Sequence, residues 1–183
     1  MNGLFESLSE RALSLGAYKA AVIPVSEVTL DASFRDMCKA NLCGAYGRNW
    51  TCPPHVGEID ELMELIRSYG YVLVYQTVSE LEDSFDIEGM EAASVRHAEL
   101  GFALRNELSD QPLLRPLHLS AGGCRLCHVC AKADDLPCRF PERAMASLEA
   151  HGINVSELAK ASGMKYINGQ NTVTYFGGVF FDL

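Results

Sequence analysis

Basic side chains and long apolar runs are both scarce in this sequence. Its 183 residues include 15 lysines and arginines against 24 aspartates and glutamates, which gives a formal charge of −9. Nonspecific nucleic-acid binding takes most of its energy from basic side chains that neutralise phosphates, so we expect no nucleic-acid partner. No apolar run approaches the roughly 18 residues that a membrane-spanning helix needs, so we also expect no membrane association.

Targeting signals and domain linkers are missing as well. Residues 1–10 contain Glu6 and Glu10 and lack the basic and apolar regions of a signal peptide. We therefore expect a cytoplasmic protein. Hydrophobic residues make up 48% of the chain, no repeat stands out, and no Pro/Ser/Gly-rich linker divides it. These features predict one compact metal-binding domain over residues 1–183, with cysteine segments at 35–55 and 122–143.

Common catalytic motifs are absent too. The sequence contains no Walker loop, dinucleotide-binding glycine fingerprint, nucleophile elbow or H-E-x-x-H helix. No pair of carboxylates can be assigned to acid–base work. The sequence therefore leaves open whether the protein is an enzyme.

Seven cysteines are present, and they fall into two groups. In a reducing compartment thiols stay open, and an odd number would leave one unpaired in any case, so disulfides are a poor explanation. Metal ligation is the favoured one.

The later group is a C-x2-C-x2-C-x7-C run that follows two glycines, Gly122 and Gly123. Its members are Cys124, Cys127, Cys130 and Cys138. Three thiolates at successive spacings of three, with a fourth from farther along, suit the corners of one iron–sulfur cluster, and the spacing favours the 4Fe–4S type. The last gap is longer than in bacterial ferredoxins, which weakens the analogy with those electron carriers. Zinc fits less well, because a structural zinc site usually joins two separated cysteine pairs, but it remains the alternative.

The earlier group is Cys38, Cys43 and Cys52, followed by Pro53, Pro54 and His55. Three thiolates can hold a second cluster and leave one iron open to water, a substrate or a residue such as His55, and an open iron is a Lewis acid. The alternative is that these are ordinary buried cysteines.

Both groups lie in locally basic segments. Residues 124–143 carry four basic and three acidic side chains, and residues 35–55 carry three basic and one acidic. Compensating charge is expected where thiolates surround a net-negative cluster, although so few residues can also be unevenly spread by chance.

Hydrophobic periodicity predicts an alternation of strands and helices. Strands are expected over 18–28, 71–78, 113–120 and 171–181, and helices over 58–69, 88–108, 141–150 and from 154 to about 163. The last strand is expected at an edge or in a hairpin with a bend at Gly177 and Gly178, and an exposed edge there would allow a homodimer. The fold class is therefore α+β, or α/β, with a mixed sheet and a cysteine-rich metal-binding insertion.

Two stretches together resemble the predicted metal-binding proteins grouped as domain of unknown function 2284. They are residues 38–55 (CKANLCGAYGRNWTCPPH) and 122–152 (GGCRLCHVCAKADDLPCRFPERAMASLEAHG). The resemblance covers nearly the whole chain. It implies a small cytoplasmic protein of anaerobic bacteria and archaea that binds metal through the seven cysteines, with no settled reaction.

Three functions follow from these observations. The first is a redox protein whose four-cysteine cluster exchanges electrons with a partner protein. The second is an enzyme whose three-cysteine cluster presents an open iron to a small molecule. The third is a zinc-stapled binding module without redox function.

Overall fold

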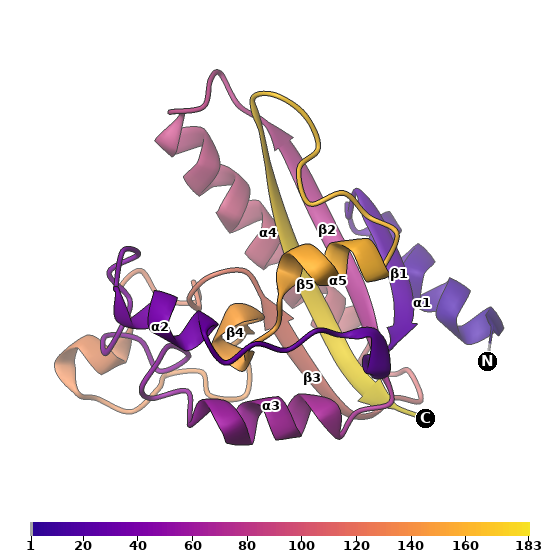
Figure 1. Ribbon diagram of the computed structural model, residues 1–183, viewed down its shortest axis with the longest axis horizontal. Coiled ribbons are helices and arrows are strands. Elements are labelled where there is room, and N and C mark those ends of the chain that lie inside the picture. Colours follow the sequence, from indigo (N-terminus) through magenta and orange to yellow (C-terminus); the bar gives the residue numbers. More distant parts are fainter. Residues whose placement is uncertain (1) are drawn as a thin grey trace.

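The computed structural model describes residues 2–183, which form a mixed five-stranded sheet with helices on both faces (Figure 1). The strands are β1 (Lys19–Pro24), β2 (Tyr71–Glu80), β3 (Leu114–Ser120), β4 (Ala146–Ser147) and β5 (Thr172–Asp182). The helices are α1 (Asn2–Ser14), α2 (Phe34–Lys39), α3 (Ile59–Arg67), α4 (Ile87–Glu107) and α5 (Val155–Ala161), with 3-10 turns η1 (Val25–Glu27), η2 (Ala131–Asp134) and η3 (Glu149–His151). The predicted α+β class is confirmed.

The strand order is β1-β2-β5-β3-β4. The pairs β1/β2, β2/β5 and β5/β3 are antiparallel, and only the two residues of β4 run parallel to β3. The central strands β2 and β5 pair over ten residues. Main-chain hydrogen bonds on both sides of β5 therefore fix the middle of the molecule.

Strand β2 is buried on both faces, which explains its nearly continuous apolar run. Val72 and Val74 face a core that is covered by α3 and α5. Leu73 and Tyr75, one residue out of phase, face a second core that is covered by α1 and α4. In Figure 1, α5 crosses in front of the sheet and α4 lies behind it.

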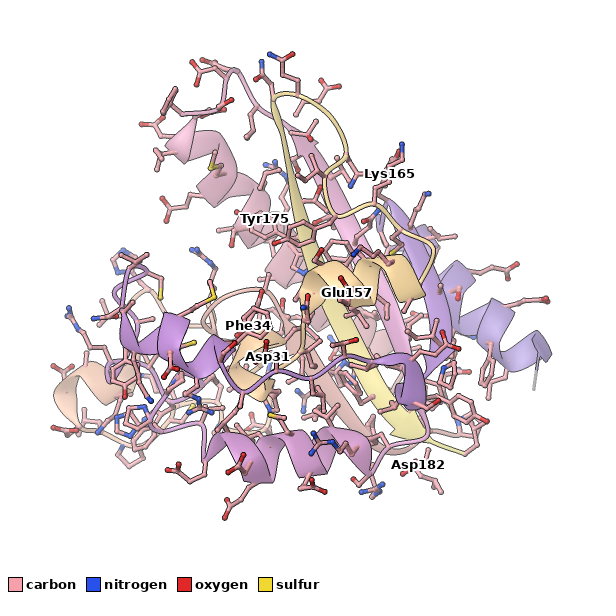
Figure 2. All side chains as sticks on the ribbon, viewed as in Figure 1. Asp31, Phe34, Glu157, Lys165, Tyr175 and Asp182 are labelled. Atoms are coloured by element: carbon pink, nitrogen blue, oxygen red, sulfur yellow. The ribbon has the colours of Figure 1, made fainter. Side chains whose placement is uncertain are left out.

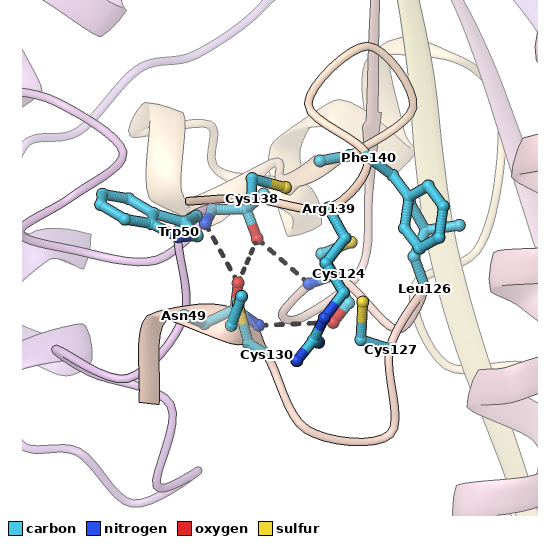
Figure 3. A pocket seen from close by; sticks show the side chains of 12 residues that line it. Asn49, Trp50, Cys124, Leu126, Cys127, Cys130, Cys138, Arg139 and Phe140 are labelled. Atoms are coloured by element: carbon cyan, nitrogen blue, oxygen red, sulfur yellow. Dashed lines mark hydrogen bonds between the residues drawn. The ribbon is translucent and has the colours of Figure 1, made fainter. Parts of the chain in front are cut away.

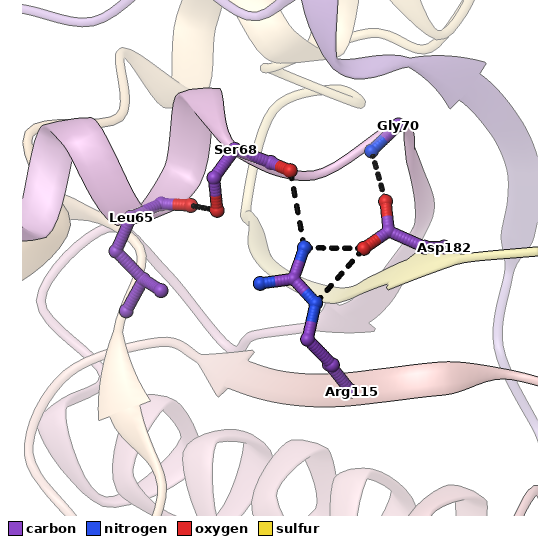
Figure 4. A network of polar contacts seen from close by, with 5 residues as sticks. All are labelled: Leu65, Ser68, Gly70, Arg115 and Asp182. Atoms are coloured by element: carbon purple, nitrogen blue, oxygen red, sulfur yellow. Dashed lines mark hydrogen bonds and ion pairs between the residues drawn. The ribbon is translucent and has the colours of Figure 1, made fainter.

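A polar network closes the end of the sheet where β5 finishes (Figure 4). Two nitrogens of Arg115 donate to Asp182, one of them over 3.0 Å, and one also donates to the carbonyl of Ser68 over 3.1 Å. The other oxygen of Asp182 accepts from the backbone N–H of Gly70 over 2.8 Å. The network thus joins β3, β5 and the turn between α3 and β2. Figure 2 labels Asp182 at this end, well away from Phe34 at the start of α2.

Several predicted elements are confirmed. The helices over 58–69 and 88–108 correspond to α3 and α4, and the strands over 71–78 and 113–120 to β2 and β3. The helix predicted from residue 154 is α5, and Asn154 caps it by accepting from the backbone N–H of Glu157 over 3.1 Å. The first predicted strand is shorter than expected, because the chain turns into η1 after Pro24.

The helix predicted over 141–150 is wrong. The chain there forms β4 and η3 instead, and Met145, Ala146, Ser147 and Leu148 are all buried. Burial on every side removes the exposed face that a surface helix needs, and pairing of Ala146 with Leu119 holds the segment extended.

The edge position predicted for the last strand is wrong for its second half, because β5 pairs with both β2 and β3 from Gly178 onward, whereas residues 172–177 pair with β2 alone. Gly177 marks no bend. A Cβ atom at this position would lie 2.2 Å from Cζ of Tyr75, so only glycine leaves room for that buried ring. The second half of β5 therefore offers no edge to a second copy of the chain, and the homodimer stays a prediction.

Helix α1 was not predicted. Leu8 and Ala12, four residues apart, are fully buried against the second core. Their spacing is helical and was a usable signal.

Candidate metal centre

The two cysteine segments lie together at one end of the molecule, on the left in Figure 1. The first begins in α2 and continues as turns to Gly57. The second begins after β3, where Gly122 adopts a φ of 67° that turns the chain out of the sheet. Both segments consist largely of turns, so side chains rather than strand pairing must hold them in place.

All four cysteines of the later group line one small cavity of about 20 Å³ (Figure 3). Apolar side chains from Trp50, Leu126 and Phe140 line it as well. The volume is that of a single water-sized object, so the cavity has room for an ion but must open to take a cluster.

Residues 2–183 contain no set of three or more cysteine, histidine, aspartate or glutamate side chains already grouped as ligands of one ion. All seven cysteines are free thiols. The ligand assignments of Cys124, Cys127, Cys130 and Cys138, and of Cys38, Cys43 and Cys52, therefore stay predictions. What the fold supplies is a shared cavity for the first set.

Hydrogen bonds from three consecutive residues, Asn49 to Thr51, tie the earlier segment to the later loop. Asn49 Nδ2 donates to the carbonyl of Cys124 over 3.3 Å, and Thr51 Oγ1 accepts from the backbone N–H of Cys124 over 3.1 Å. The Trp50 indole N–H donates to the carbonyl of Leu136 over 2.9 Å. These contacts clamp the loop at both of its ends. The only sequence signal for these three residues is that they directly precede Cys52.

Gly123 brings the two cysteine groups into contact. A Cβ atom there would lie 3.3 Å from Cys52 Sγ and 3.2 Å from Asn49 Nδ2. A larger residue at this position would require Cys52 or Asn49 to shift by a few tenths of an ångström. Cys52 of the first group is therefore next to the residue that precedes Cys124 of the second.

Burial opposes ionisation of the inner thiols. Desolvation raises the pKa of Cys52 to about 11, helped by the nearby Cys43, Cys38 and Cys130. Desolvation also raises the pKa of Cys124, while backbone N–H groups of Leu126 and Met145 act in the opposite direction. Such groups stabilise a thiolate once a metal displaces the proton.

The three-cysteine group is more open. Cys43 is exposed, whereas Cys38 and Cys52 are half-buried. Burial raises the pKa of Cys38, and the guanidinium of Arg35 partly offsets this. Arg35 itself is buried and donates to the carbonyls of Gly57 and Ala150 over 3.0 and 3.2 Å, which anchors α2 to the body of the protein.

The histidines divide between the core and the cysteine end. His97 is buried, its Nδ1 lies 2.9 Å from Thr77 Oγ1, and desolvation lowers its pKa to about 4, so it is a residue of the core. His128 is exposed in the cysteine loop. The ring of His55 meets the ring of Trp50 edge-on, 5.4 Å between centroids.

Fold and site together define an α+β protein with a cysteine-lined cavity held between two irregular segments. The family model described as predicted metal-binding protein, domain of unknown function 2284, matches residues 21–181, and the chain belongs to this family. The comparisons with curated proteins and with solved structures found no match. Among the described residues, no helix combines the length and the apolar character needed to cross a bilayer.

Proposed function

We propose that the chain is an iron–sulfur protein that holds a 4Fe–4S cluster through Cys124, Cys127, Cys130 and Cys138. One observation carries the proposal: all four thiols line the same cavity. Thiolates are the ligands that such clusters select, and thiols kept open suit a reducing, cytoplasmic compartment. The whole chain would act as one metal-binding domain.

The surroundings of the cavity fit a cluster in three respects. Trp50, Leu126 and Phe140 limit the access of water to the sulfur atoms. Backbone N–H groups of Leu126 and Met145 act on the Cys124 sulfur, as hydrogen bonds to cluster ligands do. Arg139, which also lines the cavity, donates to the carbonyl of Val129 over 3.0 Å and supplies positive charge.

A bound cluster would supply one-electron redox chemistry. The residues of this chain would bind it, shield it and hold it beside Cys52. The role we favour is electron exchange with a redox partner protein or a small molecule.

The proposal has a second form, in which Cys38, Cys43 and Cys52 hold another cluster. One iron of that cluster would lack a protein thiolate and would be open to a small molecule. The exposed Cys43 supports it, because a ligand at the surface leaves access for a small molecule. Contact between Cys52 and the Gly123 position keeps such a site close to the first one.

Zinc is the second candidate, and the size of the cavity favours it. About 20 Å³ suits one ion better than a cube of eight atoms. In that case the four cysteines would staple the loop, and the chain would be a binding module without redox function.

Anaerobic purification followed by iron, sulfide and zinc analysis tests the proposal. We expect iron and sulfide in equal amounts and an absorption band near ~400 nm that bleaches reversibly with dithionite. Cys127→Ser should abolish this signal, and Cys43→Ser should abolish only a second, ligand-responsive EPR signal. The matched control His128→Gln changes an exposed residue between two cysteines and should keep both. A colourless anaerobic protein with stoichiometric zinc would refute the redox proposal.

A further inference from the structure

A second, larger cavity of about 500 Å³ adjoins the cysteine-lined one. The two share Trp50, Thr51, Cys138 and Ala144. Volumes of this size are typical of pockets for small molecules. Anything bound here would therefore lie against the proposed metal site.

The described residues that line this cavity include no aspartate, glutamate, lysine or arginine. They are largely apolar or aromatic, with contributions from Trp50, Val56, Leu117, Leu119, Pro141 and Ala146. An ion would gain no partner of opposite charge from these walls. The lining thus favours an uncharged ligand with an apolar body.

His151 is the most deeply buried of the polar side chains that line the pocket. Its side chain is buried, with 3% of the residue exposed, and its Nδ1 lies 3.1 Å from the carbonyl oxygen of Ser147. A carbonyl oxygen can only accept, so Nδ1 carries the proton. Burial and the nearby Arg35 lower the pKa of His151, which keeps the ring neutral. Nε2 is then an acceptor, and within residues 2–183 nothing donates to it.

The other two histidines in the walls are less suited to this role. His118 pairs with Val179 in the sheet, and Val179 belongs to the second core, which α1 and α4 cover. The charge of Arg105 on α4 helps to lower the pKa of His118, so the His118 side chain lies on the α4 face of the sheet, opposite to the cavity. His55 is half-buried and packs against Trp50. His151 is therefore the group that would select among ligands.

We propose that this cavity binds a small neutral molecule with an apolar body and one hydroxyl or N–H group, which donates a hydrogen bond to His151 Nε2. The site goes beyond the proposed metal function and does not depend on which metal is bound. Its contact with Cys138 would place the ligand beside the metal ligands.

Three probes that share a cyclohexane ring separate the effects of hydrogen-bond donation and of charge on binding. They are cyclohexanol, cyclohexyl methyl ether and cyclohexanecarboxylate. Trp50 is the only tryptophan in the chain and lines the cavity, so its fluorescence reports occupancy directly, with calorimetry in parallel. We expect cyclohexanol to give a saturable change in both. The ether, which cannot donate, should bind about tenfold more weakly, because Nε2 is then left unpaired. The carboxylate should bind more weakly still.

Variants locate the site. His151→Phe keeps a ring of similar size but removes Nε2, so the preference for the alcohol over the ether should disappear. Val56→Phe narrows the cavity, leaves the His151 side chain itself unchanged and should weaken the binding of every probe. His128→Gln, the matched histidine control outside the cavity, should bind like the wild type.

The proposal would be overturned by the absence of a saturable signal, by equal affinity for alcohol and ether in the wild type, or by tightest binding of the carboxylate. Calorimetric binding without a Trp50 response would do the same, because the probe would then sit elsewhere. Metal analysis of the same samples keeps the two proposals apart. If a protein that lacks iron still binds the alcohol selectively, the iron–sulfur proposal is refuted and the proposed ligand site is supported.

Discussion

The two ends of this molecule are held together in different ways. At the end near Asp182, strands β2 and β5 pair over ten residues, and the Arg115–Asp182 network fastens the neighbouring turn (Figure 4). At the cysteine end, residues 40–57 and 121–145 form turns, and side chains such as Asn49 and Thr51 make the links between them. The first end is built from regular main-chain pairing. The second carries the seven cysteines and lacks that pairing, so a metal bound by them would contribute most to stability there.

Removal of a bound metal should produce the largest difference in behaviour between the two ends. If ligation orders the cysteine segments, stripping the metal under reducing conditions should speed hydrogen exchange in 121–145 on the order of 100-fold, because a ligand bound only to the ordered state stabilises it. Amides of β2 and β5 should keep their protection. Mass-spectrometric hydrogen exchange on the loaded and stripped protein measures both regions at once. Equal exchange in the two samples would mean that the Asn49–Thr51 contacts suffice.

The converse prediction concerns the sheet. Gly177→Ala would place a methyl group 2.2 Å from Cζ of Tyr75, a residue that is 1% exposed and whose ring stacks on His97 of α4. Overpacking of this kind should lower the free energy of unfolding by about 3 kcal/mol. Urea denaturation of the loaded protein measures it, while the metal content of the folded fraction should stay the same.

Gly3→Ala is the control for that substitution. Gly3 lies in α1 with open space around its missing Cβ, so alanine should stabilise by at most about 1 kcal/mol. If both variants changed the free energy of unfolding by the same amount, the close approach of Gly177 to Tyr75 would not determine the stability of the sheet.

The same contrast explains what the sequence could reveal. Local periodicity was enough for α3, α4, β2 and β3, because each buries one face, or two, in a regular pattern. It failed for β4, where two residues are extended only because β3 lies beside them. Periodicity also failed to place β5 at the centre of the sheet. In the sequence Gly177 suggests a bend, whereas in the structure it leaves room for the ring of Tyr75.

At the site, the sequence suggested which cysteines belong together, and the four-cysteine group does line one cavity. It could not reveal that Thr51 bonds a residue 73 positions away or that Gly123 leaves room for Cys52. Contacts between distant segments depend on the tertiary fold. The larger cavity beside Cys138 draws its walls from several elements and had no signal in any one of them.

A smaller effect is expected from Thr51→Val, which keeps the shape of the side chain and removes the oxygen. Cys124 would lose the acceptor of its backbone N–H, which costs about 1 kcal/mol. The loss should show as weaker metal retention in a chelator competition, with the sheet intact by circular dichroism. Thr29→Val, an exposed position outside both cysteine segments, is the matched control. Retention equal to that of the wild type would mean that the clamp does not support the metal site.

The smallest effect should come from Asp182→Asn at the opposite end. Hydrogen bonds from Arg115, with a further one from the N–H of Gly70, lower the pKa of Asp182 in the folded protein. A lowered folded-state pKa contributes stability that is fully present above the unfolded value of about 3.9 and is lost as the pH falls through the folded value. The variant should therefore be less stable than the wild type near neutral pH, and the difference should vanish in acid. Because half of the Arg115 side chain is exposed, solvent screens the pair and keeps the difference small.

Thermal melts between about pH 2 and 7 measure this difference in stability. The exposed Glu10→Gln on α1 is the control, and its difference from the wild type should not vanish in acid in this way. A difference that stayed constant with pH would show that shape at this position matters and that charge does not.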